Sequence, residues 1–264
     1  MDVNRYGPWA LVIGGSEGIG EHYARLLAAD GFKLVLVARQ PKPLEELSEE
    51  LRANGTDLRT ISIDMSQPDC VDQLRTVTDD IEVGLLIYNA GANSTRGTFV
   101  ELDPEVYRSV IGVNVVGQAE CVHHYGGLMA QRGHGGIILS GSGASYIGMA
   151  SLATYCGAKA FSRLFSEALW AECEPLGVDV LHLTIGVTAT PAMDRLGHDL
   201  SSFQDPAETA KEALDNIQNG PVWIVRGQSH IDDCLRKQNT WPRAEIVREA
   251  RPPTLRSHRG ALTE

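Results

Sequence analysis

The sequence predicts an α/β fold, in which a doubly wound parallel sheet carries helices on both faces within a single domain. Two observations lead to this prediction. Short runs rich in Val, Ile and Leu alternate with segments of helical periodicity, and the runs are continuously apolar rather than alternating with polar residues. Continuous runs suit strands that are covered on both faces. Alternating strands and helices with right-handed crossovers then give a parallel sheet, which binds ligands at the carboxyl ends of its strands.

The expected strands are the seven apolar runs at residues 10–14, 33–38, 59–64, 84–90, 135–141, 179–185 and 221–225. Helical patterns lie between them at residues 18–31, 43–55, 103–133 and 154–177. Several of these patterns end at glycine, and Asp103 followed by Pro104 is typical of an N-cap and first helical position. The order of elements therefore predicts a Rossmann-type arrangement.

Two stretches interrupt the alternation of strands and helices. Residues 188–206 follow the sixth expected strand, and a polar tail begins near Gly227. We expect a main domain over residues 1–226, with a lid at 188–206, and a C-terminal extension over 227–264. The extension is interpreted either as a subunit contact or as a frayed end.

Composition excludes several classes of partner. The 264 residues carry a formal charge of -11 and an isoelectric point near 5.2, which gives an unfavourable average field for nucleic acid and anionic lipid. The five cysteines are scattered without CxxC spacing, so we expect no disulfide framework and no metal site. No apolar stretch reaches the ~20 residues of a membrane span, and no secretory signal is visible at the N-terminus. A cytoplasmic protein without a membrane or nucleic-acid partner is expected.

A glycine-rich loop follows the first expected strand and leads into a helix. Glycines at this position allow a tight turn and let backbone N–H groups approach a pyrophosphate. The spacing differs from the common GxGxxG fingerprint, and a plain turn remains an alternative. Glu17 places a carboxylate in the loop, and we expect its side chain to point to solvent. The candidate phosphate-binding residues are Gly14, Ser16, Glu17, Gly18, Ile19 and Gly20.

A second group of residues has the chemistry of acid/base catalysis. Tyr155 and Lys159 are four residues apart in a helical pattern and therefore share a helix face. A nearby ammonium lowers the pKa of a phenol, whose usual value is about 10. Ser142 follows the fifth expected strand, where its hydroxyl could contact a substrate oxygen. Taken singly, a surface Tyr and Lys pair and an ordinary loop serine remain the alternatives.

Taken together, these motifs resemble the short-chain dehydrogenase/reductase family over residues 8–192. The family's Thr-Gly-x-x-x-Gly-x-Gly loop matches here, except that Ile13 replaces the threonine. Its Asn-Asn-Ala-Gly motif resembles Tyr88-Asn89-Ala90-Gly91, with tyrosine in place of the first asparagine. The catalytic set of the family is matched by Asn114, Ser142, Tyr155 and Lys159.

The resemblance implies a role for each matched residue. Tyr155 would transfer the proton, Ser142 would orient the substrate oxygen, and Lys159 would hold the ribose hydroxyls and lower the pKa of the tyrosine. Asn114 would support a water relay from the lysine. The implied cofactor contacts further along the chain are Asp64, Met65, Asn89, Ala90, Gly91, Tyr155, Lys159, Gly186, Thr188 and Thr190. The loss of the family's proline before Gly186 alters the local motif.

The residue after the second expected strand bears on the choice of nicotinamide cofactor. NAD is commonly recognised by an acidic residue at this position, whereas Arg39 stands here and suits a 2′-phosphate. We therefore favour NADP(H), with NAD(H) as the alternative. In relatives a second basic residue often occupies the position of Glu17, which limits this preference.

The resemblance implies an NAD(P)-dependent enzyme that interconverts a carbonyl and a secondary alcohol on a small molecule. Apolar residues near Ala144, Tyr146 and Met149, with the lid around 192–203, indicate a largely hydrophobic substrate. An epimerase or dehydratase is disfavoured by the loop spacing and chain length. A non-catalytic NAD(P)-binding sensor or scaffold of the same fold is the main alternative. Relatives commonly pair the Asn114 and Tyr155 helices, so a homodimer or homotetramer is expected.

Overall fold

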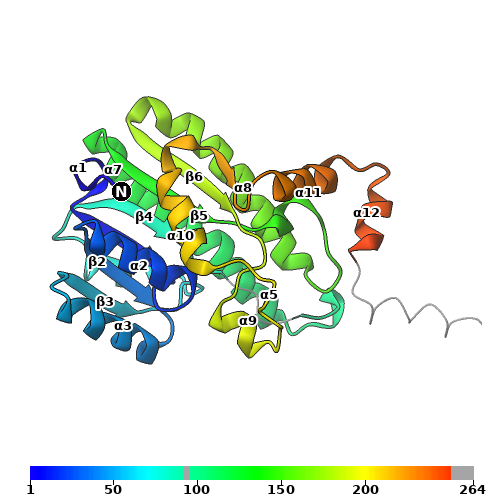
Figure 1. Cartoon of the computed structure of the whole chain (residues 1–264), viewed down its shortest axis with the longest axis horizontal. Helices are drawn as coiled ribbons and strands as arrows, with labels where there is room; N and C mark the ends of the chain where they lie inside the picture. Colours follow the sequence, from blue (N-terminus) through cyan, green and yellow to red (C-terminus); the bar gives the residue numbers. More distant parts are fainter. Residues whose placement is uncertain (92–95, 251–264) are drawn as a thin grey trace, which may run out of the picture.

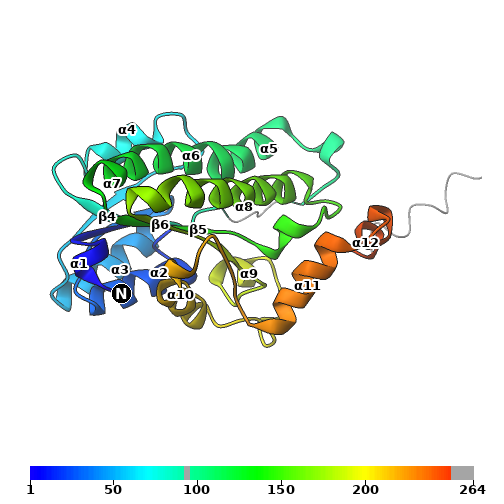
Figure 2. The same ribbon diagram turned by 90° about the horizontal axis from the view of Figure 1, so that it is seen from above.

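Seven parallel strands form one sheet in the order β3-β2-β1-β4-β5-β6-β7, with helices on both faces (Figures 1 and 2). The structure is a computed structural model that describes residues 1–91 and 96–250. The predicted doubly wound fold is confirmed. The strand order reverses between β1 and β4, which is where such sheets bind dinucleotides. The strands are β1 (Trp9–Ile13), β2 (Lys33–Ala38), β3 (Leu58–Ser62), β4 (Val83–Tyr88), β5 (Gly135–Ser140), β6 (Val178–Thr184) and β7 (Val222–Ile224).

Eight of the α-helices in the described part of the chain form two layers, seen edge-on in Figure 2. One layer contains α2, α3 and α10, and the other contains α4 to α8. The helices are α1 (Val3–Tyr6), α2 (Ile19–Ala29), α3 (Pro41–Ala53), α4 (Cys70–Arg75), α5 (Pro104–Ile111), α6 (Gly117–Cys121), α7 (Gly127–Arg132), α8 (Ala153–Cys173), α9 (Pro191–Arg195), α10 (Pro206–Asp215), α11 (Gln228–Asn239) and α12 (Arg243–Glu249).

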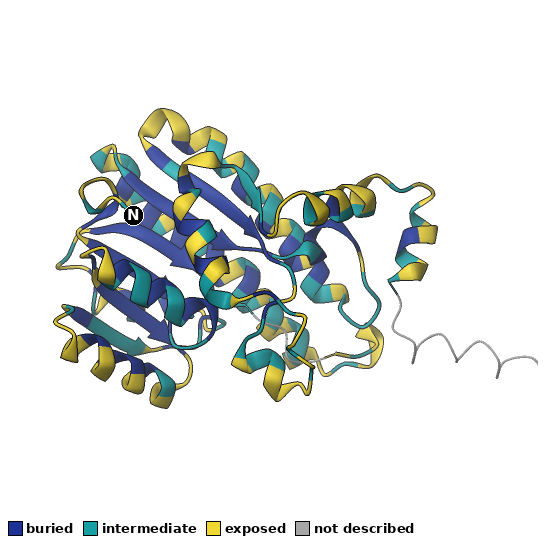
Figure 3. Cartoon of the chain, in the orientation of Figure 1, coloured by how far each residue is buried: buried dark blue, intermediate teal, exposed yellow. Residues whose placement is uncertain are grey.

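Burial explains why the strands are continuously apolar. Every residue of β1, β4 and β5 is buried, and Figure 3 shows the central strands in dark blue. Tyr23 and Leu27 of α2 pack on one face of the sheet, whereas Tyr125 and Met129 pack on the other. Because both faces are covered, neither set of side chains along a central strand meets water.

The helix predicted over residues 103–133 is observed, but it contains two π-helical segments. They are η2 (Gly112–Val116) between α5 and α6, and η3 (Val122–Gly126) between α6 and α7. A π-bulge inserts one residue into the helical repeat and changes which side chains face inward, and such bulges are frequent at functional sites. Asn114 lies in the first segment and is almost fully buried.

Several helices were not expected from the sequence. In α10, the small residues Ala210 and Ala213 are fully buried, and this helix packs against α2. Small apolar residues give a weak periodic signal, although they allow close helix packing. The polar tail forms α11 and α12 up to residue 250, and α11 packs near residues 143–146. Residues 251–264 of the predicted extension lie outside the described residues.

None of the helices in residues 1–91 and 96–250 combines the length and hydropathy that crossing a membrane requires.

Candidate active site and cofactor cleft

A cleft of about 1670 Å³ lies along the carboxyl ends of the strands. The segments that follow β1 to β6 all contribute to its walls, as expected for a doubly wound sheet. All but two of the predicted site residues line it. The exceptions are Gly20, which lies beneath the glycine loop, and Asn114, which is buried behind Gly91.

The glycine loop between β1 and α2 has room for backbone only. A β-carbon on Gly14 would lie 2.8 Å from the backbone nitrogen of Ala90, and one on Gly20 would lie 1.8 Å from the carbonyl oxygen of Gly14. Gly18 adopts a φ of 57°, and its β-position is 2.9 Å from Thr190 Cγ2. The loop therefore presents main-chain groups to the cleft at the start of α2, and this fits a pyrophosphate.

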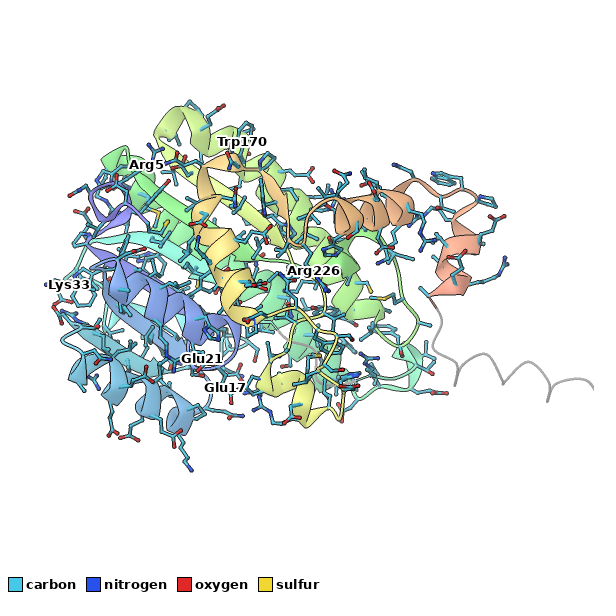
Figure 4. All side chains as sticks on the ribbon, in the orientation of Figure 1. Arg5, Glu17, Glu21, Lys33, Trp170 and Arg226 are labelled. Carbon is cyan, nitrogen blue, oxygen red and sulfur yellow. The ribbon has the colours of Figure 1, made fainter. Side chains whose placement is uncertain are left out.

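Glu17 does not extend freely into solvent as the sequence led us to expect. Its two carboxylate oxygens accept hydrogen bonds of 2.9 and 2.8 Å from Arg195 Nη1 and Nη2. Arg195 ends α9, so the bond joins the glycine loop to the segment predicted as a lid; Figure 4 labels Glu17 beside this helix. The carboxylate is neutralised by a partner 178 positions away, which is why the loop tolerates it.

The turn after β4 closes the loop from the other side. The backbone N–H of Asn89 donates to the carbonyl of Ile13 at 2.8 Å, and its side-chain Nδ2 donates to the carbonyl of Gly14 at 3.1 Å. Gly91 has a φ of 134°, which is the region that favours glycine. Its β-position would be 2.3 Å from Asn114 Oδ1, so only glycine lets the turn approach Asn114.

Tyr88, at the position of the family's first asparagine, braces the helix rather than the turn. Its fully buried hydroxyl donates a 2.6 Å hydrogen bond to the carbonyl of Val113, which belongs to the π-helical segment η2. A π-bulge weakens the regular pairing of helix carbonyls, and Tyr88 supplies a donor at that point. Because Asn114 is the next residue, this bond fixes the backbone that carries it.

Replacing Tyr88 with phenylalanine is expected to lower kcat about five- to tenfold while changing KM by less than about twofold, because one buried hydrogen bond contributes about 1 kcal/mol to the position of Asn114. Tyr125→Phe is the matched control. It removes a comparable hydroxyl, which lies 2.9 Å from Thr78 Oγ1, from the second π-helical segment. The measurements are steady-state kinetics and melting temperatures of Tyr88→Phe and Tyr125→Phe, each compared with the wild type. Equal losses of kcat in both would contradict a positioning role.

Ser142 and Tyr155 meet at the catalytic end of the cleft. Ser142 follows β5, and its Oγ accepts a 3.1 Å hydrogen bond from the backbone N–H of Ala144. Burial raises the pKa of Tyr155, and a hydrogen bond with Ser142 lowers it in part. The phenol is therefore protonated at neutral pH and can donate its proton toward the cleft.

Lys159 lies one helical turn from Tyr155 on α8. Its Nζ is 5.7 Å from the centroid of the tyrosine ring and donates a 2.9 Å hydrogen bond to the carbonyl of Ser140. Burial lowers the pKa of Lys159 to about 8. The sequence led us to expect that this lysine lowers the pKa of Tyr155, but the causes acting on the phenol here are burial, Ser142 and Cys156.

Asn114 is held from one side only. Its Nδ2 donates a 2.9 Å hydrogen bond to the carbonyl of Val110, whereas its buried Oδ1 has no partner among the described residues. The β-position of Gly91 lies 2.3 Å from this oxygen and 3.3 Å from Lys159 Nζ, so the two groups flank the same glycine. A buried acceptor without a partner is a common site for an ordered water.

The remaining predicted cofactor residues line the cleft at three strand ends. Arg39 is exposed directly after β2, and Asp64 and Met65 follow β3. The carboxylate of Asp64 accepts hydrogen bonds from the backbone N–H and hydroxyl of Ser66 at 2.9 and 2.7 Å, which orders this turn. The segment after β6 contributes Gly186, Thr188 and Thr190.

The segment predicted as a lid is closed at its base. Thr188 and Gln204 form an isolated parallel bridge, and the backbone N–H of Ala189 donates to the carbonyl of Gln204 at 2.8 Å. Between these ends, Thr190 caps the short helix α9 through a 3.4 Å hydrogen bond from the N–H of Met193. Compact loops whose ends meet in this way frequently cover sites.

One wall of the cleft was missed from the sequence. Residues of α11 line the cleft near Ser142 and Gly186. From the sequence we had assigned this helix to a polar tail. Helical spacing within residues 228–239 was the available signal, but only Cys234 of this helix is fully buried. Tyr146, by contrast, was predicted to bound the substrate pocket and does not line the cleft. The wall residues are Arg226, Ser229, His230, Asp233 and Lys237.

Comparison with known proteins identifies relatives over most of the chain. A family model described as short chain dehydrogenase matches residues 8–201. A very-long-chain 3-oxoacyl-CoA reductase of Neurospora crassa is 33% identical over 216 residues, which are 80% of this chain and 65% of that protein. A 7beta-hydroxysteroid dehydrogenase of Collinsella aerofaciens is 32% identical over 190 residues, 72% of each chain. The match thus spans less than two thirds of the fungal reductase.

Solved structures show the same arrangement. One from a study of 7beta-hydroxysteroid dehydrogenase stereoselectivity has a TM-score of 0.87 at 28% identity and covers 94% of this chain and 98% of that one. A short-chain dehydrogenase from Sphingobium yanoikuyae in complex with NADPH has a TM-score of 0.77 at 28% identity, over 87% of this chain and 92% of that one.

Proposed function

The chain belongs to the short-chain dehydrogenase family, and from this membership we propose that it is an NAD(P)-dependent oxidoreductase that interconverts a carbonyl and a secondary alcohol. The observation that carries the proposal is the meeting of Ser142, Tyr155 and Lys159 in the cleft that the glycine loop also lines. A bound nicotinamide would supply or accept the hydride. The residues of the chain would position the substrate and move the proton.

In the proposed reaction, Tyr155 donates its phenolic proton to the substrate oxygen during reduction and takes it back during oxidation. Ser142 already hydrogen-bonds the phenol and holds the same oxygen. Lys159, whose Nζ is 5.7 Å from the centroid of the Tyr155 ring, holds the ribose hydroxyls. The buried Oδ1 of Asn114, which has no partner among residues 1–91 and 96–250, would hold a water that returns protons through Lys159.

The cofactor would be NADP(H), with NAD(H) as the weaker alternative. Arg39 is exposed at the end of β2 and lines the cleft, where no acidic side chain takes the position after the strand. A guanidinium binds phosphate through paired, charge-assisted hydrogen bonds. Glu17 opposes this preference less than its charge suggests, because Arg195 neutralises it.

Replacing Arg39 with alanine is expected to raise KM for NADPH about tenfold and to change KM for NADH less than about twofold, because only NADPH presents a phosphate to this side chain. The measurement is initial rates with each cofactor, for the wild type and the variant. Arg52→Ala, at an exposed arginine of the following helix, is the control for general loss of positive charge. An NADH preference in the wild type, or equal losses with both cofactors, would contradict the assignment.

We propose a largely hydrophobic small-molecule substrate. Beyond Ser142 the cleft is lined by apolar side chains from the loop after β5 and from the segment 188–206, which acts as a lid over the site. Relatives that are named for acting on hydroxysteroids and on very-long-chain 3-oxoacyl-CoA support a bulky apolar substrate. The apolar lining residues are Ala144, Ile147, Met149, Val187, Ala192, Met193, Leu196 and Phe203.

A homodimer or homotetramer is also proposed, formed through the long helix α5–α7 and through α8. Large apolar side chains are exposed on both. Phe161 and Phe165 stack on α8, with ring centroids 5.3 Å apart. Such outward-facing groups support a subunit contact. The exposed set is Ile111, Val116, Leu128, Phe161 and Leu164.

A non-catalytic sensor or scaffold that binds the cofactor is the alternative function. A panel of ketones and secondary alcohols separates the two, with absorbance of the reduced cofactor as the readout. Turnover of a bulky ketone supports the enzyme. Cofactor binding without turnover across the panel supports the sensor.

A further inference from the structure

The link between β7 and α11 brings a charged side chain into the catalytic cleft. Val225 is fully buried and continues the sheet, since its backbone N–H donates to the carbonyl of Thr184 at 3.1 Å. Arg226 and Gly227 follow with φ angles of 75° and 67°, and α11 starts immediately after them. The side chain of Arg226 is exposed and lines the cleft, and its Cδ lies 3.8 Å from the β-position of Gly186. Figure 4 labels Arg226 in this link.

His230 fixes the geometry of this link. Its Nδ1 lies 2.6 Å from the carbonyl oxygen of Val225, and a carbonyl only accepts, so Nδ1 carries the proton. The ring edge at Nε2 faces the catalytic loop and lies 3.4 Å from the β-position of Gly143 and 3.7 Å from that of Gly186. The first turn of α11 is therefore anchored beside Ser142, and Arg226 is carried by an ordered segment.

Arg226 has no acidic partner among the described residues. The one carboxylate on the same wall, Asp233, forms an ion pair with Lys237 and lies 3.5 Å from Arg236. A positive φ is also unfavourable for arginine, because its β-carbon crowds the backbone in the left-handed region. An unpaired cation in a strained conformation, aimed into a cleft, is the arrangement expected of a ligand-binding group.

We propose that Arg226 binds a carboxylate on the substrate, so that the enzyme acts on apolar ketones or alcohols that also carry an acidic group. The guanidinium would hold the carboxylate through charge-assisted hydrogen bonds while the apolar body lies against Met149 and the lid. Arg226 lines the same cleft as Ser142 and Tyr155, so a substrate that reaches both ends of it would carry its acidic group apart from the reacting carbonyl. This inference rests on the proposed function and adds the substrate class.

The test is calorimetric titration of the protein saturated with its oxidised cofactor, in which no turnover occurs. The probes are β-benzoylpropionate, an aryl ketone with a carboxylate, and its methyl ester. We expect the wild type to bind the acid about tenfold more tightly than the ester. Arg226→Gly removes the guanidinium and relieves the positive φ, so it should abolish the difference between acid and ester without lowering the melting temperature. Arg226→Lys should retain part of the difference.

Arg236→Gln is the matched control, because Arg236 lies on the same helix but outside the cleft, and it should leave the preference intact. Equal affinity of the wild type for acid and ester, or a preference that survives in Arg226→Gly, would overturn the inference. Reduction of neutral ketones with NADPH tests the proposed function separately. Turnover without a carboxylate preference would reject the subsite alone, whereas a carboxylate preference without any turnover would reject the enzyme assignment alone.

Discussion

Replacing Tyr155 with phenylalanine is expected to lower kcat about a thousandfold and to leave cofactor affinity within about twofold of the wild type. The phenol is the acid in the proposed reaction, and such a group contributes roughly 10²- to 10⁴-fold to a rate. Phenylalanine keeps the ring beside Lys159, so cofactor contacts persist. The measurements are single-turnover rates with a bulky ketone and cofactor titration by fluorescence.

The control for this substitution is Tyr107→Phe. Tyr107 lies on α5, where its ring packs 5.4 Å from that of Phe99 and does not line the catalytic cleft. The same loss of a hydroxyl should leave the rate unchanged there. Activity of Tyr155→Phe within about tenfold of the wild type would show that another group supplies the proton.

Replacing Lys159 with methionine is expected to abolish turnover and yet to stabilise the cofactor-free protein by about 1–2 kcal/mol at pH 7. Burial lowers the pKa of this lysine from 10.5 to about 8, so the folded protein carries a buried ammonium at neutral pH at a cost. Methionine removes that cost. Methionine cannot donate the 2.9 Å hydrogen bond that Lys159 makes to the Ser140 carbonyl, and this loss limits the gain in stability.

The pH dependence of the free energy of unfolding tests whether the buried charge of Lys159 causes this stability difference. Between pH 8 and 10.5 the unfolded chain keeps the proton on Lys159 while the folded protein has released it, so wild-type stability gains from this group as pH rises. The advantage of Lys159→Met should therefore shrink over this window. Chemical denaturation of the wild type and Lys159→Met at pH 7, 9 and 10.5 measures this stability difference. Lys211→Met, at an exposed lysine, should show no such trend, and a constant advantage of Lys159→Met across the window would contradict the explanation.

The strands were predictable because burial on both faces leaves a local signature. The run at Lys33–Ala38 was predicted with both ends correct, and the other six differ from the observed strands by one or two residues at an end. The family resemblance rests on short motifs whose spacing is also local. It is confirmed by the match over residues 8–201.

The interactions that were missed join distant positions. Tyr88 finds its acceptor at Val113 only because η2 lies at the end of β4, and Glu17 finds Arg195 only after the chain has crossed the sheet. Neither partner can be read from the spacing of residues. The wall at α11 was missed for another reason, since a polar helix with one fully buried side chain has almost no periodic signal.

The bond between Glu17 and Arg195 joins the glycine loop to α9 by a contact of low strength. Both side chains are partly exposed, at 30% and 52%, and ion pairs of this kind contribute only about 0–1 kcal/mol. Even at the upper limit, roughly one molecule in six has the pair broken at any moment. Added salt should raise the fraction of molecules in which this ion pair is broken.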